Sequence, residues 1–282
     1  KSTEQNSQEA RDVVLKVLAD IKEGKEEAVR ELARKFDKWE GDFILSEEKK
    51  KKLIDSVPEQ VKKDLQFAHK QVSTFARAQR ESLKEFETEV TPGIRLGQKI
   101  IPMDVAGCYV PGGRFAHACS AIMSVATAKA AGVPFVIAAT PPRGDSIDPA
   151  VCYAMELSGA DIILEMGGIQ AIATMAYGLF TGKPANILVG PGNAFVAEAK
   201  AVLNGTGHCG IDVFAGPTES GIIADETADP AFVASDLLSQ AEHGPDSQAM
   251  LVASSRALAE RVVREVERQL AELPREAIAS RA

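Results

Sequence analysis

The first ninety residues carry apolar positions at helical spacing. In residues 7–24 the apolar side chains recur every three or four positions, and Gly24 is a typical helix stop. Residues 25–37 repeat this pattern, and Pro58 opens a longer helix with a nearly coiled-coil stripe. The stripe consists of Val61, Leu65, Ala68, Val72 and Phe75. This part of the chain is therefore predicted to be helical, with its charged residues on a solvated face.

From about Gly93 onward, short apolar runs alternate with Ala-rich amphipathic segments. The predicted strands are residues 105–110, 135–139, 161–164, 186–189, 211–214, 220–224 and 249–253. The predicted helices are residues 120–131, 149–158, 168–177, 194–203, 230–243 and 255–273. Strand–helix alternation at this spacing predicts an α/β fold with parallel sheets and helices on both faces. Glycine and proline gather at the strand ends, where ligands bind in such sheets.

Composition narrows the classes of partner. The chain of 282 residues has a formal net charge of −8, which argues against nucleic acid or an anionic membrane, since either favours a basic face. A small anionic substrate needs only a few local cations. Apolar runs stay shorter than the roughly 18–20 residues of a membrane span. A signal peptide is not recognisable, although the chain begins with Lys1 rather than Met. We expect a cytoplasmic protein.

The four cysteines lack the spacing of a metal or redox motif. Cys108, Cys119, Cys152 and Cys209 form no CxxC pair in a large chain. Reduced, partly buried thiols are the expected state.

One candidate ligand site is the segment Ile187-Leu-Val-Gly190-Pro-Gly192-Asn193, which leads directly into an Ala-rich helix. Glycine lets the backbone approach a phosphate, and a helix start offers unpaired N–H groups. The third glycine of the dinucleotide fingerprint GxGxxG is missing. Two interpretations stay open, a nucleotide site or a tight turn with Asn193 as N-cap.

Two further glycine motifs follow predicted strands. In Tyr109-Val-Pro-Gly-Gly-Arg114, the Tyr109 ring can pack on a ligand ring and Arg114 can meet an anion; a simple surface turn is the alternative. In Gly167-Gly168-Ile169-Gln170, an amide stands at a helix start, and helix-cap geometry is the favoured interpretation.

A fourth motif lies on the helix that Asp229-Pro230 opens and Gly244 closes. Gln240 and His243 are three residues apart and share a face. Gln240 also falls on the apolar stripe, where an unpaired amide would cost about 1–3 kcal/mol. It should therefore have a partner. An internal hydrogen bond is favoured, and a metal ion with His243 as second ligand is the alternative.

The other histidines carry weaker signals. His69 is predicted to be exposed in the middle of a helix. His117 follows the Gly-Gly turn and is a candidate contact of substrate or cofactor. His208 and Cys209 are predicted to lie in a surface loop, with a metal pair as the alternative. The chain contains neither a Walker motif nor a residue order that suggests a hydrolase triad.

Taken together, the motifs resemble those of the histidinol dehydrogenase family, in the same order and from about Glu9 to the last residue. They are Tyr109-Val-Pro-Gly-Gly, Gly167-Gly-Ile-Gln-Ala, Val189-Gly-Pro-Gly-Asn, Ala215-Gly-Pro-Thr-Glu, Ile223-Ala-Asp-Glu-Thr-Ala-Asp-Pro and Leu238-Ser-Gln-Ala-Glu-His-Gly-Pro-Asp-Ser. The resemblance implies an NAD-dependent oxidation of a primary alcohol to a carboxylate in two hydride-transfer steps. It also implies an intertwined homodimer of chains with two Rossmann-like domains behind a helical N-terminal segment.

The resemblance also implies roles for individual residues. Tyr109, Gln170 and Asn193 match the positions that contact NAD. Gln240 and His243 match two of four zinc ligands and also contact substrate. Thr218 stands where the family usually has a substrate-contacting serine. The expected first domain comprises residues 1–107 and 219–282, and the second, NAD-binding domain comprises residues 108–218.

Two departures from the family pattern matter. The family's catalytic Glu-His pair and its other two zinc ligands, an Asp and a His, belong to a C-terminal region without a match before Ala282. No catalytic residue is therefore expected within this chain, which should bind zinc weakly and not turn over. A naturally truncated, non-catalytic binding module is one alternative.

The second departure concerns the substrate. Four segments are more similar to the branch that oxidises 2,3-dihydroxypropane-1-sulfonate to 3-sulfolactate. They begin at Ala106, Ser120, Gly178 and Gly216. A sulfonate is a permanent anion and needs cations or N–H donors, for which Arg114 and His117 are candidates. L-Histidinol, converted to L-histidine, is the alternative substrate.

Overall fold

The computed structural model describes residues 2–112, 116–213, 218–244, 247–274 and 276–281. Contacts divide the chain into two compact units, Lys1–Ala215 and Gly216–Ala282. The predicted division into a domain of residues 1–107 with 219–282 and a domain of 108–218 stays a prediction. Among the described residues, no helix has both the length and the apolar composition needed to cross a membrane.

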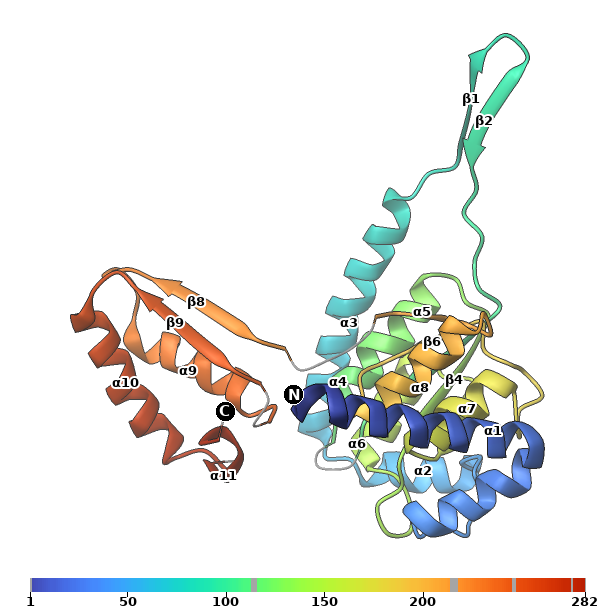
Figure 1. Cartoon of the computed structure of the whole chain (residues 1–282), viewed down its shortest axis with the longest axis horizontal. Coiled ribbons are helices and arrows are strands. Elements are labelled where there is room, and N and C mark those ends of the chain that lie inside the picture. Colours follow the sequence, from blue (N-terminus) through green and yellow to red (C-terminus); the bar gives the residue numbers. More distant parts are fainter. Residues whose placement is uncertain (1, 113–115, 214–217, 245–246, 275, 282) are drawn as a thin grey trace. The chain divides into compact units, whose positions relative to one another are not determined.

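The centre of the first unit is a parallel sheet of five strands (Figure 1). The strands are β3 (Val105–Tyr109), β4 (Phe135–Thr140), β5 (Ile162–Glu165), β6 (Ile187–Val189) and β7 (Gly210–Ile211). Their spatial order is β5-β4-β3-β6-β7. Strands β4 and β5 are added on one side of β3, and β6 and β7 are added on the other, so the strand order reverses between β3 and β6. Such a switch point opens a crevice at the carboxyl ends of the strands. The predicted parallel α/β architecture is confirmed.

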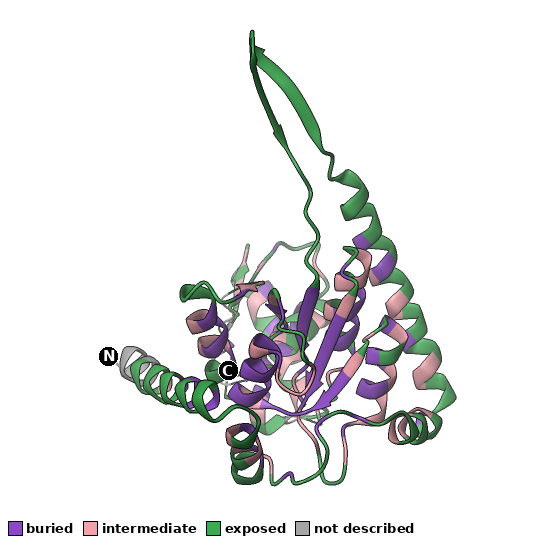
Figure 2. Cartoon of the chain, turned by 90° about the vertical axis from the view of Figure 1, so that its right-hand side faces the viewer, coloured by how far each residue is buried: buried purple, intermediate pink, exposed green. Residues whose placement is uncertain are grey.

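Helices cover both faces of this sheet, and the strands lie buried between them (Figure 2). One face carries α1 (Ser2–Phe36), α7 (Gly168–Tyr177) and α8 (Ala194–Gly205). The other carries α2 (Glu47–Ser56), α3 (Glu59–Ser82), α6 (Pro149–Ser158) and the continuous run of α4 (Ala118–Ala121), η1 (Ile122–Ala126) and α5 (Thr127–Ala130). Side chains of a strand alternate between the two cores, as Val105 and Ala106 do.

The N-terminal helices follow the predicted pattern with two differences. α1 is interrupted at Lys25, whose φ is 50°, so residues 7–24 and 25–37 are separate helical segments as predicted. The stripe of α3 is buried at Leu65 but leaves Phe75 67% exposed. Ser73 and Ala76 face the core in its place, so the near-coiled-coil expectation is wrong at that end. α2, which Ser46 caps through the N–H of Lys49, was not predicted.

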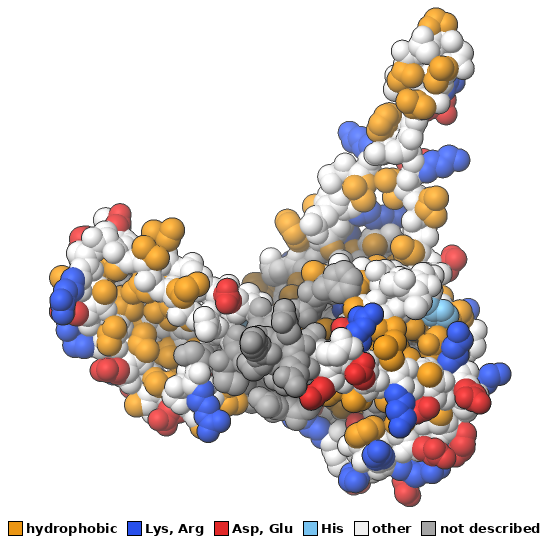
Figure 3. Space-filling view, in the orientation of Figure 1, with side chains coloured by type: hydrophobic (Ala, Val, Ile, Leu, Met, Phe, Trp, Pro, Cys, Tyr) orange, Lys and Arg blue, Asp and Glu red, His pale blue; other side chains and the backbone are white. Residues whose placement is uncertain are grey.

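A β-hairpin follows α3 and was also not predicted, so the expectation of helix throughout the first ninety residues is wrong at residues 86–90. β1 (Phe86–Thr91) and β2 (Ile94–Gln98) pair antiparallel and turn at Gly93, which has φ 85°. Every residue of both strands is exposed. Figure 3 shows apolar side chains along the hairpin. The exposed large apolar residues of its strands are Phe86, Val90, Ile94 and Leu96.

The second unit is a βαβ arrangement. β8 (Ser220–Ala224) and β9 (Ala249–Ala253) are parallel and pack with α9 (Pro230–Ala241) and α10 (Arg256–Leu270); α11 (Glu276–Ala279) follows. Ala224, Val233, Ala234, Leu258 and Val262 form its core. The predicted strands 220–224 and 249–253 are confirmed. The predicted strand 211–214 is wrong beyond Ile211, where β7 ends, since Asp212 and Val213 lie outside any strand; Phe214 is not among the described residues.

Candidate functional site

The three glycine motifs of the first unit meet at one edge of the sheet. They follow β3, β5 and β6, which run parallel in the same sheet. Tyr109 is the last residue of β3, and the register pairs it with Ala139 of β4. Because parallel strands end on the same side, the three motifs lie at the same end of the sheet, and those that follow β3 and β6 flank the switch point.

Tyr109 lies inside the protein rather than in a surface turn. Its side chain is 5% exposed, and its hydroxyl oxygen accepts a hydrogen bond of 3.2 Å from the N–H of Gly168. Burial raises the pKa of the Tyr109 phenol, the Gly168 N–H opposes this, and the charge of Asp37 adds to it. The phenol is therefore kept in its protonated form, and it joins the end of β3 to the start of α7.

Gln170 is buried at the first turn of α7, and it has a partner that sequence reasoning missed. Its Nε2 donates to Oδ2 of Asp37 over 2.8 Å, across 133 residues of chain. The Asp37 carboxylate also accepts the N–H of Gly167, the N-cap residue of α7, which has no side chain to cap the helix. Burial raises the pKa of Asp37, while these two hydrogen bonds oppose the rise. Asp37 therefore bonds to both the start of α7 and the Gln170 amide. A ligand contact of Gln170 stays a prediction.

Asn193 is the N-cap of α8, with its Oδ1 accepting from the N–H of Val196 over 3.1 Å. The preceding turn makes a close approach that only glycine allows. Gly190 has φ 114°, and a Cβ there would lie 2.0 Å from the carbonyl oxygen of Tyr109. The backbone of Gly190 therefore lies too close to the end of β3 for any side chain at position 190.

An ion pair between buried Lys200 and the partly exposed Asp212 holds the Gly190 turn from both sides, and the sequence pattern did not reveal it. Asp212 accepts the N–H of Gly190 over 2.8 Å. Lys200 donates to the carbonyl oxygen of Gly190 over 2.9 Å and pairs with Asp212. Lys200 is only 1% exposed although it sits on the otherwise ordinary Ala-rich helix α8. Asp212 and Lys200 together therefore fix the N–H and the carbonyl group of Gly190 at the switch point.

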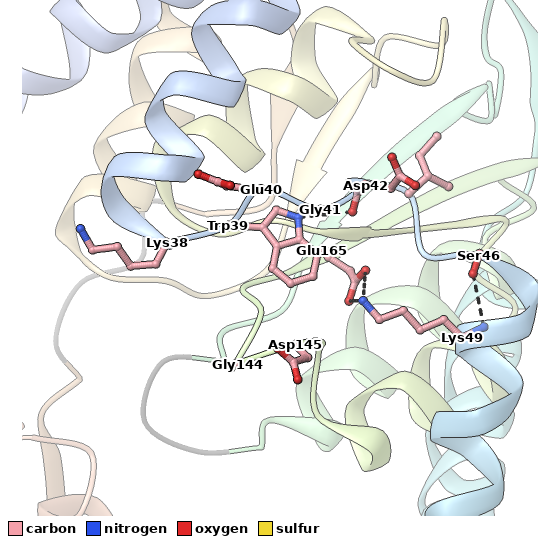
Figure 4. A pocket seen from close by; sticks show the side chains of 11 residues that line it. Lys38, Trp39, Glu40, Gly41, Asp42, Ser46, Lys49, Gly144, Asp145 and Glu165 are labelled. Carbon is pink, nitrogen blue, oxygen red and sulfur yellow. Dashed lines mark hydrogen bonds and ion pairs between the residues drawn. The ribbon is translucent and has the colours of Figure 1, made fainter.

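A separate cavity of about 420 Å³ opens beside the carboxyl end of β5 (Figure 4). At its wall, Lys49 of α2 points to Glu165, and its Nζ lies 2.9 and 2.8 Å from the two carboxylate oxygens. Ser146 donates to the same carboxylate over 2.7 Å, and the Lys49 ammonium lies 4.7 Å from the centre of the Trp39 ring. Glu40, Asp42 and Asp145 also line the cavity. The predicted cofactor residues do not line it.

In the second unit the structure brings Gln240 to Thr218. The Gln240 side chain is half-buried, and its Nε2 donates to the backbone carbonyl of Thr218. This is the internal hydrogen bond favoured by the sequence. His243 lies just beyond the end of α9 and is exposed. Among the described residues, no three His, Cys, Asp or Glu side chains gather in a way that would hold a metal.

The remaining candidates are placed as follows. Arg114 lies outside the described residues, and His117 is the half-buried N-cap residue of α4. His69 is half-buried rather than exposed, because its ring faces Ser73 at 3.1 Å from Nε2 to Oγ; burial and the charge of Arg77 lower its pKa. The ring of His208 packs edge-on to Tyr177 and its Nε2 lies 3.1 Å from the Ala176 carbonyl.

The four cysteines are free thiols. Cys119 is exposed and the others are buried. Burial raises the pKa of Cys108 and Cys152 to about 12 and that of Cys209 to about 11.

The chain was compared with known protein families, curated proteins and solved structures. The family model for histidinol dehydrogenase matches residues 1–282. The chain is 49% identical to a sulfopropanediol 3-dehydrogenase of Ruegeria pomeroyi over 97% of this chain and 62% of that protein. It is 50% identical to a histidinol dehydrogenase homolog of Pelagibacter ubique, over 93% of this chain and 61% of the relative.

More distant relatives agree. A histidinol dehydrogenase of Methanosarcina mazei is 42% identical over 90% of this chain and 59% of its own length. The crystal structure of histidinol dehydrogenase from Elizabethkingia anophelis superposes with a TM-score of 0.90 at 37% identity, over 96% of this chain and 62% of that one. The chain thus spans about three fifths of the length of these relatives, and it belongs to the histidinol dehydrogenase family.

Proposed function

We propose that this chain is the NAD-binding part of a zinc-dependent dehydrogenase that oxidises a primary alcohol to a carboxylate in two hydride-transfer steps. The observation that carries the proposal is that Tyr109, Gln170 and Asn193 all lie at the carboxyl end of one parallel sheet, where Tyr109 and Asn193 flank the switch point and Gly168 bonds to Tyr109. Ligands of open α/β sheets bind in that crevice.

The residues at this edge fit a dinucleotide. Glycines at positions 167, 168, 190 and 192 let the backbone turn tightly against neighbouring segments where β5 and β6 end. Tyr109 and Gln170 hold defined orientations through their hydrogen bonds. When bound, NAD supplies the hydride acceptor, while the protein orients it and excludes competing reactions.

Gln240 and His243 fit half of a zinc site. The Gln240 amide donates through Nε2 to Thr218, which leaves Oε1 as its ligand atom. A tetrahedral site needs two further ligands. When bound, zinc holds the substrate and polarises its oxygen. Thr218, Gln240 and His243 would then contact the alcohol from one side of the second unit.

For the substrate we propose 2,3-dihydroxypropane-1-sulfonate, oxidised to 3-sulfolactate. The relative from Ruegeria pomeroyi, a sulfopropanediol 3-dehydrogenase, supports this choice. Arg114 and His117 would bind the sulfonate, whose fixed negative charge favours charge-assisted hydrogen bonds. L-Histidinol is the competing substrate, and its cationic amine would instead need a carboxylate. We further propose a cytoplasmic homodimer without nucleic-acid or membrane partners.

The test is NADH formation by the protein in its natural full length, with each alcohol supplied separately. The expected result is two NADH for each 2,3-dihydroxypropane-1-sulfonate consumed and none with L-histidinol. Activity on L-histidinol alone would overturn the substrate, and absence of NADH together with absence of NAD⁺ binding would leave a non-catalytic binding module. Light scattering of the same sample tests the homodimer.

A further inference from the structure

Asp37 stands at the junction of the two buried residues predicted to contact NAD. It directly follows α1, and its N–H donates to the carbonyl of Ala33 over 2.9 Å. The chain then turns at Lys38, which has φ 55°, and enters the core at Trp39, which is 7% exposed. The helix end and the buried indole therefore fix the position of the Asp37 backbone.

The Asp37 carboxylate determines which end of the Gln170 amide faces it. An ionised carboxylate only accepts hydrogen bonds, so the amide must present its NH₂ end, and Nε2 lies 2.8 Å from Oδ2. The carbonyl oxygen Oε1 then points away from Asp37. It lies toward Gly168, where a Cβ would be 3.0 Å from Oε1 and where φ is 62°. Gln170 is 4% exposed, and a side chain at position 168 would press on Oε1, so the glycine lets the amide take this position.

The same carboxylate also reaches Tyr109 through the backbone. It accepts the N–H of Gly167, and the next N–H, that of Gly168, donates to the Tyr109 hydroxyl over 3.2 Å. A shift of Asp37 would therefore move both the Gly167–Gly168 turn and the tyrosine.

We propose that Asp37 is a positioning residue of the cofactor site, which holds Gln170 with Oε1 toward the ligand and sets the turn that holds Tyr109. This proposal rests on the proposed NAD-binding function. The cofactor group that meets Oε1 is then a hydrogen-bond donor, a ribose hydroxyl or an amide or amino N–H, and not a phosphate oxygen.

The competing explanation is that Asp37 only caps α7. In that case an asparagine would serve about as well, since Asn and Asp are similar caps. Burial disfavours the charge of Asp37, as its raised pKa shows, and charges kept against burial are typical of functional sites. An asparagine would also let the pair flip, because each amide can then donate to the other.

The experiment compares the wild-type chain with Asp37→Asn and with the control Asp55→Asn, on the exposed side of α2. Calorimetry gives the affinity for NAD⁺, and thermal unfolding gives the melting temperature. We expect Asp37→Asn to weaken NAD⁺ binding about tenfold, in line with loss of a charged hydrogen bond, without lowering the melting temperature. The control should change neither.

A second readout needs no nucleotide. In protein labelled with ¹⁵N-glutamine, the Gln170 side-chain amide should show a shifted, slowly exchanging N–H that Asp37→Asn weakens. Two results for Asp37→Asn would overturn the proposal. One is an unchanged Gln170 amide signal, and the other is an NAD⁺ affinity within about twofold of the wild type, since loss of a charged hydrogen bond should cost more than that. A lower melting temperature in step with the affinity would show instead that Asp37 acts through the stability of the fold, and it would overturn the positioning role. If the wild type binds no NAD⁺, the proposed function fails, and the amide signal alone decides the role of Asp37.

Discussion

Lys49 and Glu165 form an ion pair in which one ammonium nitrogen lies 2.9 and 2.8 Å from the two oxygens of a carboxylate at the end of β5. Glu165 is only 2% exposed, whereas the Lys49 side chain is 35% exposed. Lys49→Met would therefore leave a buried, unpaired charge. We expect the free energy of unfolding in urea to fall by about 3 kcal/mol at neutral pH.

A matched control is on the same helix. Lys52 pairs with Glu48 at 2.7 Å, with both side chains more than 70% exposed. Lys52→Met should cost at most about 0.5 kcal/mol. Adding Glu165→Gln to Lys49→Met should restore most of the stability, because the unpaired charge is removed. Equal losses in Lys49→Met and Lys52→Met would show that the Glu165 charge does not depend on Lys49.

Thiol reactivity should separate Cys119 from the three buried cysteines. At pH 8, a thiol with a pKa of about 12 has about a thousandfold less thiolate than one at the ordinary value of 9.0. Iodoacetamide should modify Cys119 in the native protein and the other three only after unfolding, as peptide mass spectrometry would reveal. The variant Cys119→Ser should be inert, and native labelling of Cys108 would contradict the expectation.

The pH dependence of stability should carry the signature of Asp37. Its pKa is raised in the folded protein above the ordinary 3.8, so the folded state holds the proton more tightly than the unfolded state. The contribution of Asp37 to the free energy of unfolding therefore falls as the pH rises from about 4 through the raised pKa, and it is constant above.

Asp37→Asn lacks this titration. Its stability relative to the wild type should thus rise with pH across that window, measured by urea unfolding at several pH values. Asp55→Asn, at an exposed position of α2, is the control. A relative stability of Asp37→Asn that falls with pH would mean that the Asp37 pKa is lowered instead.

Gly190→Ala should disrupt the switch point. The position combines φ 114° with a Cβ that would lie 2.0 Å from the Tyr109 carbonyl oxygen, so strand separation must accompany the change. A loss of more than about 3 kcal/mol is expected. Gly182 has φ 68° and open space around it, so Gly182→Ala isolates the backbone strain and should cost about 1–2 kcal/mol. Equal losses would contradict the close approach.

Zinc binding should depend on Gln240 and His243. Zinc content, measured by mass spectrometry of the metal-loaded protein, should be lost in the double variant Gln240→Ala/His243→Ala, since two ligand atoms disappear. His69→Ala is the control, because that ring is engaged with Ser73 in the other unit. Zinc retained by the double variant would remove both residues from the proposed site.

The sequence by itself determined those elements whose signals are local. Residues 149–158 were predicted as a helix and form α6, since Asp148 caps its start and Gly159 ends it in the left-handed conformation. The parallel sheet followed in the same way from alternating strands and helices. α2 and the hairpin were missed, because α2 has few apolar positions and the hairpin interrupts a region of helical character.

Tertiary structure alone decided the partners of the candidate site. Tyr109 and Gln170 were predicted from glycine motifs and family resemblance, but Asp37 lies 133 residues from Gln170 and Lys49 lies 116 residues from Glu165. These pairs meet because residues 43–45 run along the edge of β5, where the backbone of Phe43 and Leu45 bonds to Glu165 and Ile163. Hydrophobic periodicity and helix capping depend on residues that are neighbours in the sequence. The partner of a buried charge depends instead on which distant segments the folded sheet brings into contact.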